Sequence, residues 1–246
     1  MQAIVLKCKD FRENDQIITF YSLEQGKINL LSTGSKKITS KLAGNLTPGN
    51  LLEIDIAPGK EINHLIKLNS LCVARNIRVS LEKQLVVAYI MNLTDELVKD
   101  GHRDSNIFLL LRDWLTMIDK DKSIYQENSS CDLRVVNHAV IHDYIVKLTT
   151  CLGFVPELAM CHKCVAKNDL EWFDLQGGLI CNECCGKIPH KLNCCLISFK
   201  QIENWRKLLA NDISDIKNLI IDDRLVDLIY KFVEFHLERK IRRIKL

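Results

Sequence analysis

The hydrophobic pattern of the first 80 residues predicts short strands. Segments rich in β-branched and aromatic residues alternate with turn residues, and in residues 51–57 leucine and isoleucine alternate with glutamate and aspartate. A period of two is the signature of a half-buried strand. We predict five strands, at residues 3–7, 16–22, 27–32, 51–57 and 63–68. Five short strands joined by turns indicate an OB-type barrel, an SH3-like barrel or a sandwich.

After residue 80 the hydrophobic period becomes helical. In residues 81–97 an apolar residue recurs at every fourth position, which predicts one buried stripe made of Leu81, Leu85, Tyr89, Leu93 and Leu97. The same period predicts helices around residues 108–118, 136–148, 202–209 and 225–233. Their expected N-caps include Ser105, Asp132 and Ser198, the last in a capping box with Gln201. The second half of the chain is therefore predicted to be a helical bundle.

This change of period predicts an α+β protein with two domains. Residues 1–79 form the barrel, and residues 80–246 form the helical domain. A cysteine-rich insertion interrupts the helical domain at about residues 158–196.

The insertion contains two C-x-x-C pairs, Cys161 with Cys164 and Cys181 with Cys184, separated by sixteen residues. In a reducing compartment, closely spaced cysteines indicate metal ligands before disulfides. Two such knuckles joined by a hairpin form the pattern of a zinc ribbon. We expect one structural Zn²⁺ ion, because four thiolate ligands leave no open position for water or substrate.

Other side chains of the insertion are alternative ligands by residue type, namely Cys185, Cys194, Cys195, His162 and His190. Cys185 directly follows Cys184, so a shift of register is one alternative. We favour the two C-x-x-C pairs, because two intervening residues let both sulfur atoms converge on one ion.

Composition and charge add a candidate binding chemistry. The net charge is +3, but residues 1–80 carry 11 basic and 7 acidic side chains, and residues 239–246 carry five basic and no acidic ones. The basic loop contains Lys36, Lys37 and Lys41, and the basic tail contains Arg239, Arg242 and Arg243. Such clusters bind phosphate backbones, although a solvated loop and a charged helix end have the same composition. The first 80 residues hold only three aromatic side chains, of which we expect two to face the core.

The sequence favours no catalytic function and no membrane segment. His138 and His142 have ligand spacing on a helix, but the metalloprotease glutamate between them is missing. Residues 58–61 fail the phosphate-loop pattern, and no carboxylate cluster suggests a metal-dependent nuclease. No uncharged run approaches the length of a membrane helix, and the N-terminal residues do not form a secretory signal. We therefore expect a cytoplasmic protein that is not an enzyme.

The order of these parts resembles the bacterial RecO family of recombination mediator proteins over essentially the full chain. The most specific element is the run Leu152-Gly153-Phe154-Val155-Pro156 followed by the first C-x-x-C pair, Gly177-Gly178 and the second pair. The basic loop and the basic tail are looser matches.

The resemblance implies an OB-fold N-terminal domain, a helical C-terminal domain that holds a zinc ribbon, and association with the nucleoid. It also implies binding of single- and double-stranded DNA and annealing of complementary strands. The implied partners are RecR, the C-terminal tail of single-strand-binding protein (SSB) and, indirectly, RecA, which is loaded onto SSB-coated DNA. By this likeness, the basic loop and the basic tail contact DNA, although Ile38-Thr39 departs from the family's more basic loop. The alternative is a zinc-ribbon adaptor that binds proteins without binding DNA.

Overall fold

The contacts within the computed structural model divide the chain into two units, Met1–Ile124 and Tyr125–Leu246, which are described separately. The structure describes residues 1–37, 40, 42–72, 74–120, 125–126, 135–136, 138–191, 193–210 and 219–243. The boundary between the units therefore differs from the domain boundary predicted near residue 79. The three helices that follow the strands belong to the same unit as the barrel.

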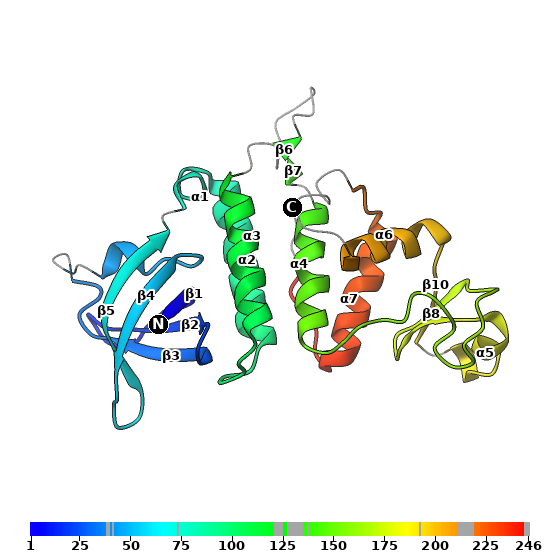
Figure 1. The fold of residues 1–246 in the computed structure, drawn as a ribbon, viewed down its shortest axis with the longest axis horizontal. Coiled ribbons are helices and arrows are strands. Elements are labelled where there is room, and N and C mark those ends of the chain that lie inside the picture. The colour runs from blue at the N-terminus through cyan, green and yellow to red at the C-terminus, as the bar shows by residue number, and fades with distance from the viewer. Residues whose placement is uncertain are drawn as a thin grey trace. The chain divides into compact units, whose positions relative to one another are not determined.

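Unit 1 contains a closed five-stranded barrel (Figure 1). Its strands are β1 (Gln2–Asp10), β2 (Gln16–Ser22), β3 (Gly26–Ser32), β4 (Leu51–Ala57) and β5 (Asn63–Cys72). They pair in the order β1-β2-β3-β5-β4, and β4 pairs again with β1. All pairs are antiparallel except β3 with β5. This closed arrangement is that of an OB-type barrel, so the predicted strands and the OB alternative are confirmed.

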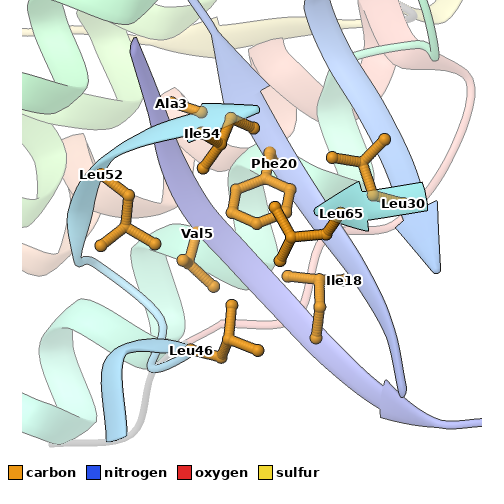
Figure 2. Close-up of a cluster of buried hydrophobic side chains, with 9 residues drawn as sticks. All are labelled: Ala3, Val5, Ile18, Phe20, Leu30, Leu46, Leu52, Ile54 and Leu65. Atoms are coloured by element: carbon orange, nitrogen blue, oxygen red, sulfur yellow. The ribbon is translucent and has the colours of Figure 1, made fainter. Parts of the chain in front are cut away.

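The barrel core is made by alternate positions of the strands, together with Leu46 from the connection between β3 and β4 (Figure 2). On β4, Leu52 and Ile54 are buried, whereas Glu53 and Asp55 are exposed, as the period of two predicts. The buried cluster comprises Ala3, Val5, Ile18, Phe20, Leu30, Leu46, Leu52, Ile54 and Leu65. The hairpin between β2 and β3 turns at Gly26, whose φ of 69° lies in the left-handed region that glycine adopts without strain.

Three helices complete unit 1: α1 (Arg75–Val79), α2 (Leu81–Leu97) and α3 (Ser105–Lys120). A short 3-10 helix, η1 (Ala43–Asn45), lies between β3 and β4. Lys27 fastens the barrel to α2, because its ammonium lies 2.9 Å from a carboxylate oxygen of Asp95 and donates a 3.0 Å hydrogen bond to the carbonyl of Val98.

The predicted stripe on α2 is wrong over its first two turns. Leu81 is 67% exposed and Leu85 is 56% exposed, whereas Val86 and Ile90 are buried. The physical reason is the helical period of 3.6 residues, since each step of four residues advances about 40° around the axis. A strict repeat of four therefore drifts across the helix surface, and only its later members reach the buried face.

Unit 2 begins with a two-stranded ladder, β6 (Tyr125–Gln126) with β7 (Val135–Val136), and continues with helix α4 (His138–Cys151). The prediction that Val136 belongs to the third helix is wrong, because it pairs with Tyr125 in this ladder. Two consecutive valines favour extended backbone, which explains the later helix start. Asp132, the predicted cap, lies outside the described residues.

The remaining elements of unit 2 are β8 (Trp172–Asp174), β9 (Gly178–Ile180), α5 (Asn182–Gly186), η2 (Pro189–Lys191), β10 (Cys194–Leu196), α6 (Phe199–Ala210) and α7 (Asp223–Leu237). The predicted capping box is confirmed, since the amide of Ser198 donates to the Gln201 side chain and the amide of Gln201 donates to the Ser198 hydroxyl. The predicted inward residues of α7, from Leu225 to Val233, are buried. No helix among the residues that the structure describes is long and apolar enough to cross a membrane.

Candidate metal centre and nucleic-acid interface

The four predicted cysteine ligands meet in unit 2. One sulfur atom from each of Cys161, Cys164, Cys181 and Cys184 lies within 4.8 Å of all the others. The Sγ atoms of Cys164 and Cys181 are 3.6 Å apart, and the cysteines with described side chains are all free thiols. The sequence spacing thus predicted which side chains come together, across sixteen intervening residues.

Each pair lies in a tight turn held by backbone hydrogen bonds. In the first turn, the amide of Cys161 donates to the carbonyl of Ala166 at 2.8 Å, and the amide of Val165 donates back to the carbonyl of Cys161 at 2.9 Å. In the second turn, Cys181 is the N-cap of α5, because its sulfur accepts a hydrogen bond from the amide of Cys184 at 3.4 Å. These bonds aim both sulfur atoms of a pair in one direction.

A three-stranded sheet holds the two turns together, with strand order β10-β8-β9. The amide of His162 donates to the carbonyl of Leu179 at 2.8 Å, which ties the first turn to β9 just before Cys181. The β8–β9 hairpin turns at residues 175–177, so of the predicted turn Gly177-Gly178 only Gly177 lies in the turn, and Gly178 begins β9 paired with Asp174. Gly178 has a φ of 124°, and a Cβ atom there would overlap the backbone of Glu157. A glycine is therefore required at this close approach.

The electrostatics of the cluster favour a bound cation. Burial disfavours the charged form of Cys161, but backbone hydrogen bonds from Cys181, Cys164 and Lys163 outweigh it and lower the pKa of the Cys161 thiol to about 6. Hydrogen bonds with the thiols of Cys164 and Cys181 raise the pKa of Cys184 to about 12. Without a bound cation, Cys161 therefore ionises readily, whereas Cys184 resists ionisation.

The donor set fits a tetrahedral thiophilic metal. Four sulfur atoms at about 2.3 Å from one zinc ion stand roughly 3.8 Å from one another, close to the spacing of these thiols. Four-sulfur sites are typical of zinc and of iron–sulfur chemistry. The four side chains are close enough to hold one ion and would enclose it.

The alternative ligands lie outside this cluster. Among the residues that the structure describes, the four-cysteine set is the group close enough for a metal ion, and it contains none of Cys185, Cys194, Cys195, His162 or His190. Cys185 is buried and packs with Cys194 in the apolar core of the ribbon. The ring nitrogen Nε2 of His162 lies 3.0 Å from a carboxylate oxygen of Asp174 instead.

Aromatic side chains anchor the ribbon to the helices of unit 2. Phe173 on β8 stacks on Trp205 of α6 at 4.9 Å between ring centroids and meets Phe232 of α7 edge-on at 5.7 Å. Trp205 and Phe232 also pack edge-to-face, at 5.8 Å. Aromatic packing of this kind adds to the gain from burial, so the sheet is docked through β8.

The predicted basic loop lies at one edge of the barrel. Lys36 and Lys37 are exposed, and Lys41 lies outside the described residues. The ammonium of Lys36 is 2.6 Å from a carboxylate oxygen of Asp10, and this bond lowers the pKa of Asp10. The partnership with Asp10 is a feature that sequence reasoning missed, because the two residues are 26 positions apart.

The basic tail leaves the helix at once. Glu238 has a φ of 52°, so α7 ends at Leu237, and Ile241 is buried beyond it. Arg243 is 2.8 Å from a carboxylate oxygen of Asp227 and lies over the ring of Tyr230 at 5.0 Å. Two of the predicted DNA contacts, Arg239 and Arg242, are exposed, whereas Arg243 is already paired with acidic and aromatic partners on α7.

An OB-type barrel joined to a helical unit, in which four cysteines lie close enough to hold a metal ion, defines the class of this two-part protein. Two family models cover this arrangement: "Recombination protein O N terminal" matches residues 1–75, and "Recombination protein O C terminal" matches residues 78–245. The chain therefore belongs to the RecO family, whose members are DNA repair and recombination proteins.

Curated relatives extend over nearly the whole chain. The DNA repair protein RecO of Desulforamulus reducens is 26% identical over 98% of this chain and 91% of its own length. The proteins of the same name from Alkaliphilus metalliredigens and Pelotomaculum thermopropionicum are 21% and 24% identical over 97% and 98% of this chain, and over 93% and 90% of their own. The family resemblance inferred from the sequence is confirmed.

Proposed function

We propose that this protein is a recombination mediator that binds single- and double-stranded DNA and anneals complementary strands. In this role it acts with RecR, contacts the acidic C-terminal tail of SSB, and helps to load RecA onto SSB-coated DNA at the nucleoid, in the cytoplasm. The observation that carries the proposal is the exposed pair Lys36 and Lys37 at the edge of an OB-type barrel in a member of the RecO family.

Annealing of this kind requires charge neutralisation and no bond chemistry. Two DNA strands repel each other through their phosphates, and lysine side chains that neutralise phosphates lower this barrier without reading sequence. We therefore propose that the protein is not an enzyme. Incubation with labelled DNA and Mg²⁺ tests this, and a cleavage product would refute it.

We also propose that the metal is one structural Zn²⁺ ion held by Cys161, Cys164, Cys181 and Cys184. When bound, the ion supplies a positive charge shared by four thiolates and leaves no position for substrate. The chain's own residues then keep the two turns fixed relative to β9. About one equivalent of zinc on reduced, freshly purified protein is the expected result, and iron or no metal would refute the assignment.

Fluorescence anisotropy with labelled single-stranded DNA tests the DNA-binding proposal. The affinity should fall with salt, with a log–log slope of about −0.7 for each neutralised phosphate. Replacing both Lys36→Glu and Lys37→Glu should weaken binding at least about tenfold at low salt and make the slope shallower by about 0.7 to 1.4, because Asp10 already neutralises part of the charge of Lys36. The matched control is Lys60→Glu with Lys67→Glu, which makes the same charge change at exposed barrel positions elsewhere. Equal losses in both double variants would refute a role for the loop.

Strand annealing with and without SSB then tests the mediator role. The protein should accelerate duplex formation between complementary oligonucleotides, and the acceleration should persist when SSB coats both strands. Binding without any acceleration would reject the annealing step.

A protein-binding adaptor is the second candidate, and one observation favours it. Two of the predicted DNA contacts already have acidic partners, Lys36 with Asp10 and Arg243 with Asp227. These pairs reduce the positive charge that is available for phosphates. Retention of RecR binding together with no DNA binding in dilute buffer would select the adaptor over the mediator.

A further inference from the structure

The barrel exposes one aromatic ring at the edge that carries the basic loop. Phe11 is 48% exposed, whereas Phe20 and Tyr21, the other aromatic residues of the first 80, are completely buried. The expectation that two of the three rings face the core is therefore confirmed. An exposed phenylalanine loses the gain of burying its ring and leaves the ring accessible to a ligand.

The exposed ring lies on a turn that is hydrogen-bonded to the basic loop. Within the turn between β1 and β2, the amide of Phe11 donates to the carbonyl of Asp15 at 3.1 Å. The side chain of Asp15 accepts a 2.8 Å hydrogen bond from the amide of Gly34, and the carbonyl of Asn14 accepts one from the amide of Lys36 at 3.1 Å. The Phe11 ring and the lysines of the basic loop therefore lie on neighbouring turns that are joined by hydrogen bonds at one edge of the barrel.

A second set of bonds ties the same two turns together through side chains. Asp10 accepts hydrogen bonds from Lys36 at 2.6 Å and from Gln16 at 3.2 Å, and Gln16 in turn accepts one from the buried hydroxyl of Ser35 at 3.1 Å. Because these hydrogen bonds already order the two turns, their backbone loses little conformational entropy when a ligand binds.

The side chains on this edge combine the two features that single-stranded nucleic acid requires. The guanidinium of Arg12 lies 5.1 Å from the centroid of the Phe11 ring, and Lys36 and Lys37 are exposed on the adjoining loop. Proteins that bind single strands without sequence preference pair a cationic track for phosphates with aromatic rings on which bases stack.

We propose that Phe11 is a stacking platform for one base of single-stranded DNA, with Arg12, Lys36 and Lys37 holding the flanking phosphates; this inference rests on the proposed DNA-binding function. Because Asp10 already neutralises part of the charge of Lys36, charge alone gives this edge modest affinity, and the ring supplies the remainder. Bases inside a duplex are stacked on each other and cannot reach the ring. The platform therefore favours single strands over duplexes.

The test compares two oligonucleotides of equal length and charge, one of thymidines and one with abasic sugars throughout, by fluorescence anisotropy. Phe11→Leu should weaken binding of the thymidine oligonucleotide at least about fivefold, the lower end of the cost of losing one base–aromatic stack, and should leave the abasic one unchanged. Phe11→Trp should keep or strengthen the preference. The matched control is Phe199→Leu, which removes a 72% exposed ring from the other unit and should change neither affinity.

A second measurement uses the unmodified protein, so the result does not depend on how a variant folds. An oligonucleotide that contains 2-aminopurine should show quenched fluorescence on binding, since stacking on the ring quenches this base analogue. No quenching, or equal losses by Phe11→Leu for thymidine and abasic strands, would overturn the stacking platform while leaving DNA binding intact. Failure of the unmodified protein to bind either oligonucleotide would instead overturn the proposed function.

Discussion

Replacing one buried sulfur ligand should unfold the ribbon while leaving the barrel folded. The apolar cluster of the ribbon has four buried members, Cys161, Ile180, Cys181 and Cys185, and two of these, Cys161 and Cys181, are proposed metal ligands. Cys181→Ser replaces a proposed ligand that is 5% exposed and would leave the other three sulfur atoms without a closed metal site.

The magnitude follows from comparing the ion with the core that would remain. Complete burial of an isoleucine such as Ile180 contributes about 2–3 kcal/mol. Structural zinc contributes about 10–16 kcal/mol in zinc-finger peptides at neutral pH. The metal term is several times larger than the contribution of any one such side chain, so its loss should unfold the two cysteine turns and the strands that they hold. Zinc content should fall from about one equivalent to well below half.

Hydrogen exchange followed by mass spectrometry locates the loss. Amides of β8 and β9 should exchange freely in Cys181→Ser, whereas those that pair β1 with β2 should stay protected, because they belong to the other unit. The matched control is Cys185→Ser, which replaces a neighbouring buried thiol outside the metal cluster and should keep its zinc. Full protection and a full equivalent of zinc in Cys181→Ser would refute the four-cysteine site.

Two further changes test interactions seen only in three dimensions. Asp10→Asn removes the carboxylate partner of Lys36, so affinity for single-stranded DNA should rise and the salt slope measured by anisotropy should steepen by less than about 0.7, because Asp10 neutralises only part of the charge of Lys36. Asp222 caps α7 through a 2.8 Å hydrogen bond from the amide of Leu225, and Asp222→Ala should cost about 1 kcal/mol, or roughly 2–4 °C in Tm, whereas Asp222→Asn should cost less. Partial burial opposes ionisation of Asp222, but hydrogen bonds from Gln201 and from backbone amides outweigh it and lower its pKa below 3.8. The unfolded chain therefore binds the proton more readily, and this part of the stability should be present above about pH 4 and disappear in melts at lower pH. An unchanged salt slope, or equal melting of the alanine and asparagine variants, would contradict these expectations.

Features set by short-range chemistry were predictable from the sequence. A C-x-x-C turn, the Ser198–Gln201 capping box and the alternation along β4 each depend on residues a few positions apart, and the structure contains all three. The OB-type barrel, in which β1 pairs with β4, was only one of three alternatives, because strand pairing depends on contacts between distant segments.

What sequence reasoning missed depends on contacts between distant residues. The pairing of Lys36 with Asp10 spans 26 positions, and that of Arg243 with Asp227 spans 16, so composition shows the charges but not their partners. The prediction of the buried face of α2 was wrong for a related reason. A repeat of four residues predicts a helix, but it does not determine which side of the helix packs on the core. Sequence patterns therefore indicate candidate site residues, but they do not show how many of the basic side chains are already paired with acidic residues.

The charge of the ribbon indicates that the ribbon itself should not contact DNA. Residues 158–196 contain four lysines and four acidic residues, so their formal balance is zero before any metal is counted. Four thiolates on one divalent cation add two negative charges, which makes the proposed zinc-bound ribbon anionic. An anionic module repels phosphates. We therefore expect contact with the DNA backbone at the barrel edge with Lys36 and Lys37 and at the exposed tail residues Arg239 and Arg242, whereas the ribbon is better suited to stabilising unit 2 or binding a protein partner.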